Sequence, residues 1–361
     1  MVMWEYIQQW YQRKFSDPNA VTLFLLLVVV VLVIVFFGSL IAPLLIAISL
    51  AYLLDWPVMR LMGLGLSRLT ATIITFSLFL ALMIVTLLTL VPVIWQQSTT
   101  LIQEMPDMVT NLQIWLHKLP EMFPTIVDDS QITEFTQEVK RRAVSLGESL
   151  LTVSLTSIVN VMAMLVYLII VPLLIFFMLK DRDILIAHFS RLLPSNRQLI
   201  SQVGQEMNLQ IMNYIRGKAI EVVVVAIVTF VTFSLFGLRY SALLSIMVGL
   251  SVLIPYVGAA VATIPVVLVA LFQFGPTAAF VWVTVAYLVI QALDGNLLVP
   301  LLFSEAISLN PVYIIGAVLI FGGIWGFWGV FFAIPLASLV KAVLTAWDSG
   351  TGEKAEEQTP L

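Results

Sequence analysis

The chain has 361 residues, of which 61% are hydrophobic and 11% charged, with a mean hydropathy of +1.06 and a net charge of −4. So few polar side chains cannot cover the surface of a water-soluble core, and the weakly acidic balance argues against a nucleic acid partner. The absence of cysteine excludes disulfides, thiolate metal sites and cysteine nucleophiles. We therefore expect an all-α, polytopic integral membrane protein with about eight transmembrane helices in a lipid bilayer.

The first charge-free run covers residues 21–54 and is too long for a single crossing of about 30 Å. It fits either one kinked helix or a tight hairpin that turns at Gly38. Basic residues precede this run at Arg13 and follow it at Arg60. Because basic residues favour the cytoplasmic side of short loops, the charges favour the hairpin.

The remaining charge-free runs predict further crossings. Because the total of about eight crossings is even, both termini lie on the same side of the membrane, which we expect to be the cytoplasm. Within 240–293 the chain must cross at least twice, and the segments 240–272 and 311–340 fit either full crossings or re-entrant hairpins. The predicted divisions are 1–103 (first hairpin and third span), 104–148 (extracytoplasmic helical insert), 149–179 (fourth span), 180–218 (cytoplasmic amphipathic helices), 219–347 (C-terminal membrane core with broken helices) and 348–361 (disordered acidic tail).

Charge predicts opposite sides for the two polar inserts. Residues 104–148 carry 4 basic and 8 acidic residues, whereas 180–218 carry 6 basic and 3 acidic residues. The first insert begins with a heptad stripe of apolar residues, and a second stripe follows it: Leu101, Met105, Met108, Leu112, Trp115, Leu119 and Met122, then Ile132, Phe135, Val139, Ala143, Leu146 and Leu150. Pro106 and Pro120 are expected to confine the first helix to about 107–119. The stripes fit a helical hairpin that packs on the chain's own membrane domain, an oligomer contact, or both.

A few polar residues lie within the predicted hydrocarbon region, where they are costly and hence candidates for a substrate or ion pathway. These are Gln291, Asp294, Asn296 and Glu221. Each has a plainer interpretation. Glu221 fits a residue at a helix end that reaches toward Arg216 or Lys218, and Asp294–Gly295–Asn296 is typical of a turn.

Breaks in the backbone are the second indication of a pathway, because non-helical backbone at membrane depth must be buried in protein or line a cavity. Transporters use such broken helices to bind substrates. For the glycines, close helix packing is the plainer interpretation. The expected breaks involve Pro255, Gly258, Pro265, Gly295, Pro300, Gly322, Gly323 and Gly326.

Motifs of soluble enzymes are missing from the sequence. There is no phosphate-binding Gly-rich loop and no metal-ligand constellation, so we expect no catalytic residues, no metal and no cofactor. Transport would have to draw its energy from an ion gradient or from the concentration of the substrate itself.

Four motifs together resemble the autoinducer-2 exporter family, and the resemblance extends from Trp10 to Lys341. The motifs are Asn213-Tyr-Ile-Arg-Gly-Lys218, Ile254-Pro-Tyr-Val-Gly-Ala259, Leu293-Asp-Gly-Asn-Leu-Leu-Val-Pro300 and the run from Gly322 to Pro335. The resemblance implies a multi-pass protein of the bacterial inner membrane that forms homo-oligomers and exports autoinducer-2 or, in some members, exchanges sodium for protons. Many members have His-Pro where this chain has Asn310–Pro311, so one titratable group is absent.

Three functional hypotheses follow. The leading one is a secondary transporter or exporter of a small polar solute, with Asp294, Asn296 and Gln291 facing the solute or an ion. The second is cation/proton exchange with Glu221 or Asp294 as the titrating carboxylate. The third is a membrane scaffold without transport activity, whose 104–148 insert binds an envelope partner.

Overall fold

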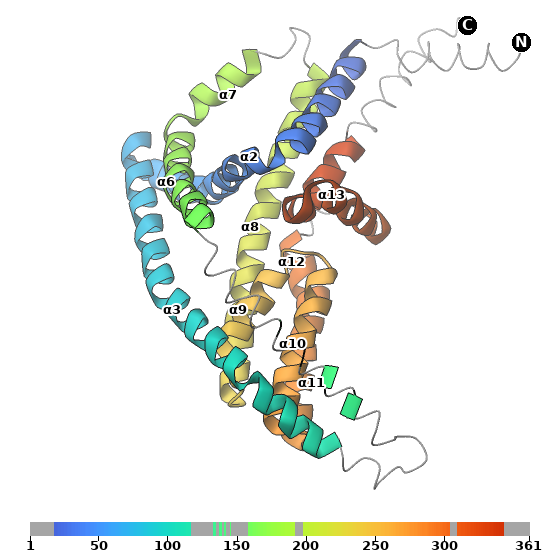
Figure 1. The fold of residues 1–361 in the computed structure, drawn as a ribbon. Coiled ribbons are helices and arrows are strands. Elements are labelled where there is room, and N and C mark those ends of the chain that lie inside the picture. The colour runs from blue at the N-terminus through green and yellow to red at the C-terminus, as the bar shows by residue number, and fades with distance from the viewer. Residues whose placement is uncertain are drawn as a thin grey trace, which may run out of the picture. The chain divides into compact units, whose positions relative to one another are not determined.

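The computed structural model describes residues 18–116, 133–134, 137–138, 141, 145, 158–191, 198–303 and 309–342. Every regular element in these residues is helical, which confirms the predicted all-α class. Six helices of at least 18 residues are apolar enough to cross a membrane, and three shorter apolar helices accompany them (Figure 1). The chain is a multi-pass membrane protein.

The chain divides into two compact units. Unit 1 comprises Met1–Ile73, Ile170–Gly217 and Phe303–Leu361, and unit 2 comprises Ile74–Ile169 and Lys218–Leu302. Two segments, 240–272 and 311–340, fit either a full crossing or a re-entrant hairpin by sequence. The first lies in unit 2 and the second in unit 1.

Helix α2 (Pro18–Gly63) is continuous over 46 residues, so the predicted hairpin at Gly38 is wrong. A turn there would leave backbone groups without partners in hydrocarbon, whereas a glycine inside a helix costs only about 1 kcal/mol. Figure 1 shows α2 bending along its length, and Pro43, which has no N–H to donate, lies inside it. Gly38 serves a different purpose, because a Cβ there would meet the indole of Trp325.

Two more helices run through predicted boundaries. Helix α3 (Arg68–Leu116) has 49 residues and continues past Pro106 into the predicted insert, so this proline does not begin a new helix. Helix α8 (Gln198–Leu235) likewise joins the predicted amphipathic helix to the next span. At 1.5 Å per residue α3 is about 74 Å long, more than twice the hydrocarbon thickness, so part of it must tilt or project from the bilayer.

The first heptad stripe packs on the core of unit 2. Met108 is buried in that core and Leu101 packs against it. This supports packing on the chain's own membrane domain. The second stripe, from Ile132 to Leu150, lies outside the described residues.

In unit 2 the segment after α8 is a helical hairpin. Helix α9 (Ser241–Ser251) and helix α10 (Val257–Phe274) pack against each other, and α10 packs against α11 (Ala278–Leu293) (Figure 1). The backbone leaves the helical conformation at residues 252–256. The two helices approach so closely that a Cβ on Gly258 would collide with the Ser251 carbonyl. With 11 residues, α9 is only about 16 Å long and does not cross the bilayer alone.

Unit 1 contains a second hairpin. Helix α13 (Pro311–Phe331) reverses at Gly326, whose φ of 61° suits glycine, and the helix Ala333–Ala342 follows it. A Cβ on Gly329 would collide with the Phe321 carbonyl across the reversal. A small core of Ala317, Val318 and Ala333 joins the two arms.

A tyrosine from α8 compensates for a missing hydrogen bond in this second hairpin. The carbonyl of Phe331 would receive the N–H of residue 335 in a regular helix, but that residue is Pro335. The hydroxyl of Tyr214 donates to the Phe331 carbonyl instead, at 2.8 Å. The tyrosine is 2% exposed, and its ring packs against Phe303 and Phe331.

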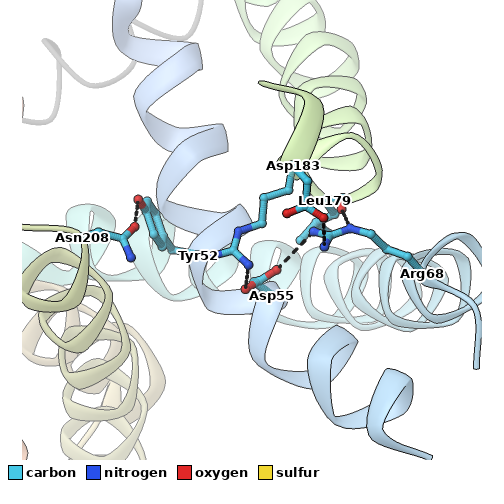
Figure 2. Close-up of polar contacts among 7 residues, drawn as sticks. Tyr52, Asp55, Arg68, Leu179, Asp183 and Asn208 are labelled. Carbon is cyan, nitrogen blue, oxygen red and sulfur yellow. Dashed lines mark hydrogen bonds and ion pairs between the residues drawn. The ribbon is translucent and has the colours of Figure 1, made fainter. Parts of the chain in front are cut away.

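An ion network joins four helix ends in unit 1 (Figure 2). These belong to α2, α3, α6 (Ile158–Lys180) and α7 (Arg182–Arg191). Asp55 contacts the guanidinium groups of Arg68 at 3.7 Å and Arg182 at 3.5 Å. Arg68 also donates to the Leu179 carbonyl at 3.0 Å and to Asp183 at 3.2 Å. The network fixes the start of α7 against α2 and α3.

Gly329→Ala should destabilise the protein by about 1–3 kcal/mol, because the new methyl group must displace a backbone carbonyl. Gly316→Ala in the same helix is the matched control, since no atom lies within 4 Å of the position that its new methyl group would take. It should change stability by less than about 1 kcal/mol. Thermal unfolding of the detergent-purified variants measures both, and equal losses would contradict the close-contact explanation.

Tyr214→Phe keeps the ring but removes the hydroxyl, so the Phe331 carbonyl loses its donor. We expect a loss of about 1–3 kcal/mol in unfolding free energy, the usual cost of an unpaired buried polar group. Tyr313→Phe, at a residue 68% exposed, should shift stability by less than about 0.5 kcal/mol. If the two variants unfold at the same temperature, the hydroxyl does not stabilise the hairpin.

Candidate functional site

A buried ion pair lies in the middle of α8, within unit 2. The Lys218 ammonium is 2.8 Å from a carboxylate oxygen of Glu221, three residues later in the helix. Lys218 is 6% exposed and Glu221 is 1% exposed. The predicted partner Lys218 is confirmed. The predicted position at a helix end is wrong, because Glu221 is buried in the middle of α8.

Lys218 also binds the broken backbone at the tip of the α9–α10 hairpin. Its ammonium donates to the Val252 carbonyl at 2.8 Å. The turn around this carbonyl is tight: the N–H groups of Leu253 and Ile254 each bond a carbonyl three residues earlier. The next donor in that series would be Pro255, which has no N–H. The lysine therefore supplies the hydrogen bond that the proline cannot make.

Asp294 reaches this region from α11, and here the structure differs from the predicted turn. Helix α11 continues into a π-helix (Asp294–Leu298) and then into α12 (Val299–Phe303). The Val299 N–H bonds the Asp294 carbonyl five residues earlier. In hydrocarbon a continuous helix keeps its backbone groups paired, which outweighs the turn preference of Asp-Gly-Asn. Single-turn π segments inside helices are frequent at functional sites.

The carboxylate of Asp294 acts electrostatically on both Glu221 and Lys218. One of its oxygens is shielded from solvent and has no hydrogen-bond partner among the described residues. The same holds for the amide nitrogen of Gln291, one turn earlier in α11. Asn296 is exposed and donates to the Ala292 carbonyl of its own helix at 2.8 Å.

The expected backbone breaks fall at separate places. Pro255 and Gly258 shape the tip of the α9–α10 hairpin, while Gly295 and Pro300 lie in the π-helix and α12. Pro265 lies inside α10, which continues past it, so the predicted break there is wrong. A single missing N–H is tolerated because the neighbouring helical bonds remain.

The other three expected breaks, Gly322, Gly323 and Gly326, belong to α13 in unit 1. Only Gly326 of these three has non-helical backbone angles. The cluster in unit 2 therefore contains Lys218, Glu221 and Asp294, and Lys218 connects it to the tip at Val252.

Polar contacts also hold the base of the α9–α10 hairpin. The side chain of Gln273 accepts from the Arg239 N–H at 2.6 Å and donates to the Gly237 carbonyl at 2.8 Å. Glu104 on α3 accepts from Arg239 at 2.9 Å and from the Tyr240 hydroxyl at 2.7 Å. Burial and the Glu104 carboxylate raise the pKa of Tyr240 to about 12, so the phenol remains a donor at physiological pH.

The sequence did not predict that Lys218 contacts both Glu221 and the Val252 carbonyl. It identified Lys218 only as one of two basic residues that Glu221 could reach. The spacing of three residues puts both side chains on one face of α8, and this signal could have identified the pair. The Val252 carbonyl could not be identified as a partner of Lys218, because no pattern in the sequence shows which side chain lies beside a backbone break. The described residues contain no group of three metal-ligating side chains.

Comparison with known proteins places the chain in a family of transport proteins. Residues 23–349 match the family described as "AI-2E family transporter". The chain is 51% identical to "Putative permease PerM" of Escherichia coli (strain K12) over 348 residues, 96% of this chain and 99% of the relative.

A more distant relative is "Putative transport protein YueF" of Bacillus subtilis (strain 168), 26% identical over 314 residues, 85% of this chain and 84% of the relative. The family match covers the hairpin tip, the π-helix and the Lys218–Glu221 pair within one continuous region. The chain belongs to the AI-2E transporter family.

Proposed function

We propose that the chain is a secondary transporter that exports a small polar solute, an autoinducer-2-like molecule, across the bacterial inner membrane. Membership of the AI-2E transporter family supports transport. The solute, the direction and the inner-membrane location with cytoplasmic termini are parts of the proposal. So are an extracytoplasmic 104–148 insert and a homo-oligomeric assembly.

One observation carries the proposed site: a buried ammonium pairs with a carboxylate and donates to the broken backbone of a hairpin, and a second carboxylate acts on that pair. Lys218 contacts both Glu221 and the Val252 carbonyl, and Asp294 acts on both charges. Charges at membrane depth are costly and are retained mainly where they serve transport. Broken helices at substrate sites of transporters offer carbonyls and helix ends in the same way.

The unpaired polar atoms indicate how a solute would bind. The free oxygen of Asp294 can accept a hydrogen bond from a solute hydroxyl, and the amide nitrogen of Gln291 can donate one to a solute oxygen. Lys218 holds the tip of the hairpin through the Val252 carbonyl. A solute that draws Lys218 away from Val252 would release this tip, which gives binding a route to a conformational change.

Cation/proton exchange is a second candidate function. It is favoured by the charge of the cluster, in which two carboxylates face one ammonium. A cation or a proton could neutralise the remaining negative charge. The two functions are separable, because exchange moves protons without any organic solute.

Asp294→Asn should lower solute flux in proteoliposomes at least tenfold, because the amide removes the charge and one acceptor oxygen at the site. Glu221→Gln should have a similar effect. Asp107→Asn and Glu206→Gln, at exposed positions on α3 and α8, are the matched controls and should transport like the parent protein. The assay measures uptake of labelled polar solutes into these proteoliposomes, with and without a sodium or proton gradient.

Unchanged flux in folded Asp294→Asn protein would contradict the proposed site. A sodium pulse that leaves an interior pH dye unmoved would count against the exchange function. If both exchange and solute flux survive every substitution in unit 2, the transport pathway lies elsewhere.

Lys218→Met should destabilise the protein by about 3–5 kcal/mol, because it leaves the Glu221 charge buried without its partner. The double variant Lys218→Met/Glu221→Met removes both charges and should recover part of that loss, although the Val252 carbonyl still lacks its donor. Transport should be abolished in both variants. Thermal unfolding of the single and double variants measures the coupling. Additive losses in the double variant would show that the two side chains do not act as a pair.

A further inference from the structure

A basic surface lies in unit 1, near the ends of α2 and α6 and the start of α3, and extends along α7 to its last residue. Its charged residues are Arg60, Arg68, Lys180, Arg182 and Arg191 against Asp55, Asp181 and Asp183. The chain as a whole carries a net charge of −4, so an excess of basic residues at one place is unusual for it. We call these eight residues, with Trp56 and the residues 184–186, the α7 surface.

The acidic residues of the α7 surface are engaged within it. Asp55 contacts two arginines and Asp183 contacts Arg68, as Figure 2 shows. Asp181 lies 3.7 Å from the Lys180 ammonium. Arg60 and Arg191 are exposed and have no acidic partner in the part of the chain that the structure describes. The surface therefore presents uncompensated positive charge at these two arginines.

Large apolar side chains lie exposed beside these charges. Ile184 is 57% exposed and Ile186 is 55% exposed, with Leu185 between them on α7. Trp56 is 51% exposed, and the guanidinium of Arg60 lies 5.0 Å above its ring. Exposed aliphatic and tryptophan side chains beside basic residues are typical of segments that lie in the membrane interface.

The ion network gives α7 a fixed position relative to α2 and α3. Arg182, the first residue of α7, is held by Asp55. The next residue, Asp183, is held by Arg68 (Figure 2). The apolar residues 184–186 follow directly and cannot turn away independently of this anchor. The charges and the apolar side chains are therefore presented together rather than on a free segment.

We propose that the α7 surface binds the headgroups of anionic phospholipids in the bilayer that surrounds the chain. Arg60 and Arg191 contact the phosphate groups, which guanidinium binds in bidentate geometry. Trp56 and the residues 184–186 insert among the upper acyl segments. A zwitterionic lipid also offers phosphate, but its net charge is zero, so the uncompensated charge of the surface selects anionic lipid.

The experiment uses the full chain, purified in detergent and exchanged into mixed phosphatidylglycerol and phosphatidylcholine. Native mass spectrometry counts the lipids of each kind that the protein retains. We expect the parent to prefer phosphatidylglycerol, and each of Arg60→Gln and Arg191→Gln to reduce this preference about five-fold. Raising the salt concentration to about 0.5 M should, by screening, weaken the parent's preference by roughly the same factor.

Arg141→Gln is the matched control, because Arg141 is exposed in unit 2 and pairs with Glu138 at 2.9 Å. It should retain the parent's preference, as should Arg60→Lys/Arg191→Lys, which keeps the charge. The proposal is overturned if the parent shows no preference for phosphatidylglycerol, if the glutamine variants match the parent, or if Arg141→Gln loses as much preference as they do.

Discussion

Hydrocarbon offers no water to a backbone carbonyl or N–H, so each break in a membrane helix needs a partner from elsewhere in the protein. The two hairpins among the described residues each contain a carbonyl that a proline has deprived of its donor. In unit 2 the ammonium of Lys218 bonds the Val252 carbonyl beside Pro255, and in unit 1 the hydroxyl of Tyr214 bonds the Phe331 carbonyl before Pro335. The two donors stand four residues apart on α8. Each hairpin thus depends on one side chain of the same helix.

The choice of donor distinguishes the two hairpins. A tyrosine hydroxyl brings no charge, so its bond to Phe331 can serve structure alone. A lysine brings a positive charge that burial makes costly, and the chain offsets it with Glu221 and Asp294. A neutral donor would have satisfied the Val252 carbonyl at lower cost. The presence of three charges where one hydroxyl would suffice is the physical reason why we propose a transport site at the α9–α10 tip.

The all-helical class was predictable from apolar run length, and the breaks at Pro255 and Gly326 were predictable from proline and glycine, whereas Pro265 lies within a continuous helix. The continuous helix at Gly38 and at Asp294 was not predictable, because both positions have residues that favour turns. The need to keep backbone hydrogen bonds paired in hydrocarbon outweighs this preference. Glu221 and Asp294 were predictable as candidates because charges are rare in the spans. The spacing of three residues also offered Lys218 as a partner of Glu221, but the bond from Lys218 to the Val252 carbonyl was not predictable, since no pattern in the sequence links these two residues.

The short length of α9 has a consequence for how the protein is made. A translocation channel releases a segment into lipid when the segment is long and apolar enough, and α9 with 11 residues falls short. It must therefore enter the bilayer together with α10, as one folded unit, after α8 has been synthesised. Lys218 and Glu221 precede Val252 in the sequence, so they are synthesised before the carbonyl that Lys218 bonds. The ion pair lies within α8 and needs no part of the hairpin, whereas the tip of the hairpin gains this hydrogen bond only when it meets Lys218.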